Sequence, residues 1–166
     1  MPVLVDKRWK GRAEVALVRR AVQETLKSEG VSLSCEVSVV LADDAFIRAL
    51  NRSYMGIDAP TDVLSFPQQS DKQNTGKILG DIVVSIPTVK SQAGEHGVSF
   101  VYELALVVVH STLHLLGYDH DDEHSRARMW ERQDALAAII FETISTPDGS
   151  RKITSSHGKG LQPGSS

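Results

Sequence analysis

Three histidines lie within eleven residues of one another, in the stretch VVVHSTLHLLGYDH. His110 and His114 are four residues apart, and on a helix this spacing brings two side chains onto one face, with Cβ atoms about 5 to 6 Å apart. Two imidazole nitrogens can then reach one ion at the roughly 2.0 to 2.1 Å that zinc requires. Gly117 is typical of a helix end, because glycine accepts the left-handed conformation without steric penalty. His120 follows this turn and can approach the same ion from outside the helix.

The pattern predicts three nitrogen ligands and a fourth position open to water, which is the arrangement of catalytic zinc sites. Two other interpretations stay open. The histidines can be unrelated to one another, or they can hold a structural zinc, which needs a fourth protein ligand from the acidic residues nearby or from His124. Imidazole also binds nickel, copper and iron, so zinc is the first expectation among several divalent metals.

The residue after the first histidine is Ser111, where metalloproteases carry a glutamate that acts as general base. A standard protease mechanism is therefore disfavoured, and the metal itself would have to lower the pKa of its water. Asp119 and Asp121 are candidates to orient a metal ligand or to assist catalysis. Alternatively, they cap the helix that follows. A calcium loop is excluded, since His124 stands where that loop needs glycine.

Hydrophobic periodicity predicts the elements that position these residues. Apolar residues at helical spacing predict helices over residues 11–29, 44–55, 87–96, 99–116 and 123–143. Alternating or short apolar runs predict strands over residues 3–5, 35–41, 63–66 and 79–86. The histidine-bearing helix is apolar nearly all round, which predicts its burial against the sheet. Residues 68–77 are polar and aperiodic, which is typical of a surface loop and a candidate lid.

The order of strands and helices lacks the regular alternation of a doubly wound fold. We therefore expect an α+β domain in which a mixed β-sheet packs with helices. The 166 residues fit one domain, which we assign to residues 1–144. Residues 145–166 are rich in Ser, Gly and Pro and are expected to form a disordered C-terminal tail.

The composition is that of a globular protein, with 41% hydrophobic and 23% charged residues. The single cysteine, Cys35, lies in an alternating apolar stretch and predicts a buried thiol in a reducing compartment. No apolar run approaches the roughly 18 residues of a membrane span. Asp6, Lys7 and Arg8 interrupt any signal-peptide core. We therefore expect a cytoplasmic protein without membrane contact.

Three segments resemble a known family. HSTLHLLGYDH is similar to the His-Gly-x-Leu-His-Leu-x-Gly-Tyr-Asp-His motif of the YbeY family of bacterial endoribonucleases. LNRSYMGIDAPTDVLSFP, at 50–67, and LGDIVVS, at 79–85, resemble the second and third signatures of that family. Together with the segment around Gln92 and the region of Gln133, the likeness covers about residues 35–140.

The resemblance implies that His110, His114 and His120 are zinc ligands on a zincin-like fold with a central metal-bearing helix. It also implies single-strand RNA cleavage in small-subunit rRNA 3′ end maturation and in ribosome quality control. The partners would then be ribosomal RNA precursor and the small ribosomal subunit, with no DNA expected. Two alternatives are a noncatalytic ribosome-associated factor with a structural metal, and a hydrolase of a peptide or small amide.

The chain departs from the family pattern at two positions. Ser111 replaces a glycine, a small change. Met55 replaces an arginine that is thought to contact RNA phosphate in the family, and a thioether cannot replace the five donors of a guanidinium. Arg48 or Arg52 can take over that contact, or each can be an ordinary solvated helix residue. A net charge of -3 is low for an RNA-binding protein, although residues 1–20 are mainly basic and can form a patch.

Overall fold

The structure is a computed structural model that describes residues 3–7, 15–31, 35–68, 78–118 and 123–144. Four strands form one sheet in the order β1-β2-β4-β3: β1 (Val3–Lys7), β2 (Glu36–Ala42), β4 (Ile78–Ser85) and β3 (Val63–Pro67). β1, β2 and β4 run parallel, and β3 is antiparallel to β4 at the edge. The expected α+β class with a mixed sheet is confirmed. The predicted tail, 145–166, lies outside the described residues.

Five helices complete the described part of the chain: α1 (Val15–Ser28), α2 (Asp44–Met55), α3 (Ile86–His96), α4 (Phe100–Leu115) and α5 (Glu123–Ile144). Local chemistry sets several of these bounds. The side chains of Asp43 and Ser99 accept hydrogen bonds from backbone N–H groups in the first turns of α2 and α4. Gly56 and Gly97, with φ of 72° and 69°, end α2 and α3. The expected helix starts and stops are therefore confirmed within one or two residues, except at 11–14, which lie outside the described segments.

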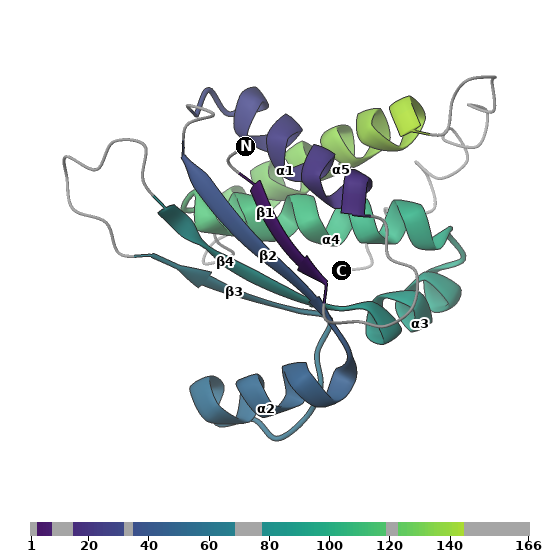
Figure 1. The fold of residues 1–166 in the computed structure, drawn as a ribbon. Coiled ribbons are helices and arrows are strands. Elements are labelled where there is room, and N and C mark those ends of the chain that lie inside the picture. Colours follow the sequence, from purple (N-terminus) through teal and green to yellow (C-terminus); the bar gives the residue numbers. More distant parts are fainter. Residues whose placement is uncertain (1–2, 8–14, 32–34, 69–77, 119–122, 145–166) are drawn as a thin grey trace.

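The two faces of the sheet carry different helices (Figure 1). Successive side chains of a strand point to opposite faces, and Val39 and Leu41 belong to a cluster that also contains side chains of α1, α3, α4 and α5. Val40 and Ala42 belong instead to a smaller cluster with α2. α1 contacts β1, α4 contacts β3 and β4, and α5 packs against both of these helices. Eleven of the sixteen residues of α4 are buried, which confirms the predicted burial of the histidine-bearing helix.

The structure differs from the sequence-based expectation at Cys35. Cys35 is only half-buried rather than buried, because it precedes β2 instead of lying within the strand. The predicted loop 68–77 falls outside the described residues after Gln68. In the described part of the chain no single helix has the length and hydrophobicity of a membrane span; α3 and α4 reach them only together, across a bend of 114°.

Candidate active site

The first two histidines of the motif lie side by side on α4. The ring centroids of His110 and His114 are 4.7 Å apart, and their planes meet at 80°. Both residues are half-buried, whereas Ser111 and Leu113 between them are fully buried. This separation is compatible with two ring nitrogens meeting at one ion, at about 2.0 to 2.1 Å each. The i, i+4 spacing therefore brings the two imidazole rings together on one face of α4, as the sequence predicts.

The ring of His110 is held from α5 by Gln133. Nδ1 of His110 lies 2.6 Å from Oε1 of Gln133, which is almost fully buried. Because an amide oxygen only accepts hydrogen bonds, the ring hydrogen belongs to Nδ1 and the lone pair to Nε2. A carbonyl partner on one ring nitrogen is typical of histidines that bind metal through the other. Sequence reasoning gave Gln133 no role, and its place in the region of family likeness was the only signal.

The third histidine, His120, lies outside the described residues together with Asp119 and Asp121. The described chain reverses direction just before it. Gly117 has a φ of 105°, and the N–H of Tyr118 donates to the carbonyl of Leu113 across 3.1 Å. Among the described residues no group of three His, Cys, Asp or Glu side chains could hold a metal. The predicted turn is thus present, and the complete ligand set stays a prediction.

Polar contacts join Tyr118, after this turn, to Glu29 and to α5. The hydroxyl of Tyr118 donates to Oε1 of Glu29, just after α1, across 2.6 Å. Arg132 of α5 approaches the same carboxylate, with Nε 2.7 Å from Oε2 of Glu29. The guanidinium of Arg128 lies 5.9 Å from the centroid of the Tyr118 ring. The last described residue before the third histidine is therefore fixed by α1 and α5.

A pocket of about 420 Å³ is lined by residues of α4 and of the edge strand β3. Its walls combine the two histidines with one strand and the residue preceding it: Asp62, Val63, Leu64, Ser65, Pro67, His110, Ser111 and His114. β3 is the outermost strand on this side of the described sheet (Figure 1). The pocket is therefore open to a ligand that approaches along the edge of the sheet.

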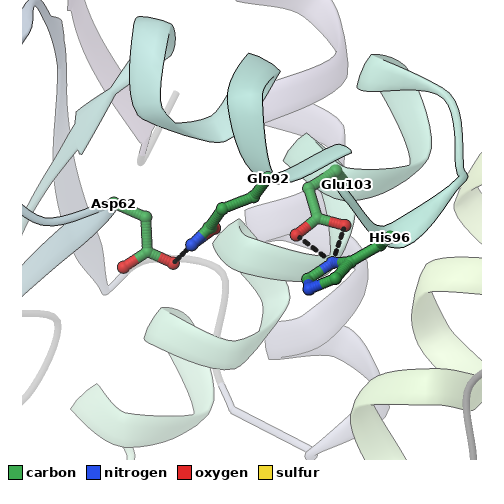
Figure 2. A network of polar contacts seen from close by, with 4 residues as sticks. All are labelled: Asp62, Gln92, His96 and Glu103. Atoms are coloured by element: carbon green, nitrogen blue, oxygen red, sulfur yellow. Dashed lines mark hydrogen bonds and ion pairs between the residues drawn. The ribbon is translucent and has the colours of Figure 1, made fainter. Parts of the chain in front are cut away.

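Asp62 is one of the residues that line this pocket. Its Oδ1 accepts a hydrogen bond from the hydroxyl of Thr61 at 3.3 Å, and its Oδ2 accepts one from Nε2 of Gln92 at 3.4 Å (Figure 2). Its backbone carbonyl accepts from the N–H of Ser85 at 2.8 Å. Sequence reasoning missed Asp62, although it lies in the family-like segment 50–67. Asp62 lies in the same pocket as the histidines because β3, which follows it, pairs with β4, and the sequence does not predict that pairing.

A second polar pair in Figure 2 lies outside the pocket wall. Nδ1 of His96 is 3.1 Å from Oε2 of Glu103, whose side chain is 4% exposed. The contact joins the last turn of α3 to the first turn of α4. His96 therefore serves the packing of these two helices, and it provides a histidine for comparison with the motif pair.

Ser111, which replaces the family glycine, is fully buried and lines the pocket. Its hydroxyl has no hydrogen-bond partner in the part of the chain that the structure describes. A buried hydroxyl without a protein partner is costly unless water or a ligand satisfies it.

The candidate substrate arginines do not line the pocket. Arg48 and Arg52 lie on α2, which covers the face of the sheet opposite to α4. Nε of Arg48 is 2.8 Å from Oδ1 of Asp58, and this hydrogen bond raises the pKa of Arg48. The same bond lowers the pKa of Asp58, and the charges of Arg48 and Arg52 lower it further. Arg48 is thus already engaged by a carboxylate, whereas Arg52 is exposed in the last turn of α2.

The basic N-terminal segment is mostly outside the described residues. Arg19 and Arg20 are the part of it that lies on α1. Arg20 pairs with Glu24 one turn later, with Nε 3.8 Å from Oε2. The described part of this segment therefore adds little unpaired charge, and a basic patch there stays a prediction.

Comparisons with known proteins agree with the motifs. A family model described as Endoribonuclease YbeY matches residues 6–140. A protein of Pelotomaculum thermopropionicum named Endoribonuclease YbeY is 47% identical over 145 residues, which is 82% of this chain and 95% of that protein. A protein of Moorella thermoacetica with the same name is 47% identical over 138 residues, or 78% of this chain and 88% of its own length.

A solved structure shares the fold. The solution structure of TM1509 from Thermotoga maritima aligns with a TM-score of 0.62 and 27% sequence identity. The alignment covers 99% of each chain. The arrangement of the four strands and five helices is therefore one that a related chain also adopts.

Proposed function

The chain belongs to the YbeY endoribonuclease family, and on that premise we propose that it is a metal-dependent hydrolase that cleaves single-stranded RNA. Its proposed substrate is the precursor of small-subunit ribosomal RNA, cut during 3′ end maturation. Its proposed partner is the small ribosomal subunit, with ribosome quality control as a further role. The pair of neighbouring imidazoles on α4, at the wall of an open pocket, is the observation that carries this proposal.

Zinc is the proposed metal, with His110, His114 and His120 as its ligands. The donors support this assignment, since two imidazoles lie together and one of them has the tautomer with its lone pair on Nε2. In this proposal α4 is the central metal-bearing helix of a zincin-like fold, and the turn at Gly117 brings the third histidine back to the ion. When bound, zinc supplies Lewis acidity, which lowers the pKa of water toward about 7 and polarises phosphoryl oxygens.

The chain's own side chains would bind, orient and move protons. Asp62 lines the pocket, and its carboxylate accepts hydrogen bonds from Thr61 and Gln92. We propose that this carboxylate accepts the proton that the attacking water loses as the water oxygen bonds to phosphorus and the P–O bond to the leaving ribose oxygen breaks, and that the proton then passes to that leaving oxygen. Asp119 and Asp121 are adjacent in sequence to the third histidine, and their proposed role is to orient the ligands.

Loss of one motif histidine tests the proposal. Purified protein is expected to cut small-subunit precursor RNA, and His114→Ala to lack this activity, because two ligands hold the metal too weakly. Elemental analysis should find about one zinc per chain in the wild type and less in the variant. His96→Gln is the matched control. This variant changes a histidine that does not line the pocket, and the amide of the new glutamine can still donate a hydrogen bond to Glu103. RNA cleavage should therefore persist.

Three results would contradict this function. Equal cleavage by His114→Ala would remove the metal from the mechanism and point to a contaminating nuclease. Unfolding on metal removal, together with undiminished ribosome binding by His114→Ala, would favour a noncatalytic factor with a structural metal. Cleavage of peptides without cleavage of RNA would assign the pocket to a peptide hydrolase.

A further inference from the structure

Apolar side chains gather at the surface where α2 ends. Tyr54 is 66% exposed, Met55 49% and Ile57 53%. These three are half of the six large hydrophobic residues that are exposed in the described part of the chain. Single exposed apolar side chains need no explanation, but three within four residues make the end of α2 a candidate binding surface.

Tyr54 presents a ring rather than a flexible chain at this surface. Its centroid lies 5.4 Å from that of Phe66, with the two planes at 64°. In such an edge-to-face pair each ring uses at most one of its faces. Because Tyr54 is also two-thirds exposed, at least one face of its ring is accessible to a planar ligand.

The loop that follows α2 is held in place, so this surface is preorganised. The side-chain amide of buried Asn51 donates to the carbonyl of Ala59 across 2.9 Å. Arg48 binds Asp58 in the same loop. A surface that is ordered before binding avoids part of the entropy cost of binding.

The ring of Tyr54 is linked to the candidate active site through β3. Phe66, which touches Tyr54, is flanked in β3 by Ser65 and Pro67, and both of these line the histidine pocket. Alternate side chains of a strand point to opposite faces. Tyr54 and the pocket therefore lie on the two sides of β3, and β3 is the edge strand of the described sheet (Figure 1). A flexible polymer can cross this edge and contact both.

Charge favours a nucleic acid as that polymer. Arg52 is exposed in the last turn of α2, two residues before Tyr54. With Arg48 and Asp58 as an ion pair, Arg52 leaves this corner of α2 with a net positive charge. Surfaces that bind single-stranded nucleic acids combine aromatic rings, on which bases stack, with positive charge, which attracts the backbone, and the end of α2 carries one of each.

We infer that Tyr54 is a base-stacking site for single-stranded RNA, a few nucleotides from the phosphodiester that is bound in the histidine pocket. The nature of the ligand rests on the proposed endoribonuclease function. Phe66 supports the ring from β3, and Arg52 supplies positive charge to the RNA backbone. Tyr54 thus acts in substrate binding and positioning, not in the chemical step.

Binding measurements with two replacements of the same residue test this site. His114→Ala protein, which is not expected to cleave, is titrated with a fluorescent oligoribonucleotide of small-subunit 3′ end sequence, alone and combined with Tyr54→Leu or Tyr54→Phe. Loss of one stacked base is worth about 1 to 3 kcal/mol, so Tyr54→Leu should weaken binding roughly 5- to 150-fold. Tyr54→Phe should stay within about 2-fold, because the ring remains.

An abasic scan separates stacking from a merely structural role. One nucleotide at a time is replaced by an abasic unit. At the position whose base stacks on Tyr54, the parent and Tyr54→Leu proteins should bind the abasic RNA equally well, because the stacking partner is already missing. Thermal unfolding of each variant checks that the fold persists. If Tyr54→Leu binds the intact RNA as the parent does, the stacking site does not exist. If Ile57→Ala weakens binding as much as Tyr54→Leu, the RNA is held by general apolar contact with this surface, and Tyr54 is not a stacking site.

Failure of this site and failure of the proposed function give different results. If the wild type cleaves RNA and Tyr54→Leu has an unchanged KM, the stacking site is refuted and the nuclease function stands. Binding that depends on Tyr54, without cleavage by any form of the protein, would remove the nuclease and keep the RNA site. When both hold, Tyr54→Leu should raise KM and leave kcat nearly unchanged.

Discussion

Met55 stands where the resemblance to the family signature predicts an arginine. It is the last residue of α2 and is half exposed. A side chain at this position therefore reaches solvent beside Tyr54. Because Arg48 is bound to Asp58, Arg52 is the main cation that this end of the helix offers to a phosphate. The departure at position 55 should thus lower the affinity for RNA without altering the pocket.

Replacing Met55 with arginine tests whether a positive charge at this position strengthens RNA binding. Met55→Arg should bind single-stranded RNA more tightly than the wild type. It should also steepen the fall of log K with log salt concentration by about 0.7 if the new charge meets one phosphate. Titrations of a labelled oligoribonucleotide at several potassium chloride concentrations measure both effects. Met55→Gln, which makes the side chain polar at nearly the same length without adding charge, should show neither effect; an equal gain in that variant would exclude a contact that depends on charge.

At the scale of secondary structure, three elements meet at Gly80 of β4. Its φ of 151° is one that side chains rarely adopt, and a Cβ there would lie 2.5 Å from the carbonyl oxygen of Phe66. The same atom would lie 2.8 Å from Cδ2 of Leu115 and 3.0 Å from Cα of Pro67. β3 and α4, which form the two walls of the pocket, therefore both approach the backbone of β4 closely at this residue.

Gly80→Ala should consequently damage both stability and activity. Backbone strain and overpacking together should lower the free energy of unfolding by about 2 to 5 kcal/mol. RNA cleavage per folded molecule should also fall, because β3 must move away from β4. Urea unfolding and cleavage assays below the unfolding transition measure these effects. Gly94→Ala in α3 is the control. Nothing lies within 4 Å of its added Cβ, so stability should be unchanged or slightly higher.

For the molecule as a whole, the packing of α3, α4 and α5 partly buries an ionisable side chain, Asp134 of α5. Burial, together with the charges of Asp134 and Glu103, raises the pKa of Tyr102 to about 12. Burial also raises the pKa of Asp134 above its ordinary value of 3.8. His96 binds Glu103 on the same side of α4. Packing of α3, α4 and α5 thus places a carboxyl group of α5 where its charged form is disfavoured.

The stability of the whole protein should depend on pH through this group. Because folding raises the pKa of Asp134, its protonated form favours the folded state, and this contribution is fully present below pH 3.8. It is lost as the pH rises through the raised pKa. Asp134→Asn should therefore be more stable than the wild type at pH 7, and the difference should shrink toward pH 4. Urea unfolding at a series of pH values measures it. A constant difference would contradict a buried carboxyl group.

Much of the fold was predictable because its signals are local. Caps such as Asp43 and Ser99 and the glycines that follow α2 and α3 act on backbone groups a few residues away, so the sequence alone locates the helix ends. The spacing of His110 and His114 likewise predicts their neighbouring rings. The mixed sheet followed from the order of elements, but the position of β3 at its edge did not, since strand pairing depends on contacts between distant segments.

What the sequence by itself determined is the pair of histidines on a buried helix, the turn after it and the family. Only the tertiary structure decided which distant groups meet this pair. Gln133 reaches His110 from 23 residues away, and Asp62 comes beside the same pocket through the antiparallel pairing of β3 with β4. Local spacing cannot predict such contacts, because they exist only when helices and strands that are remote in the chain pack against one another.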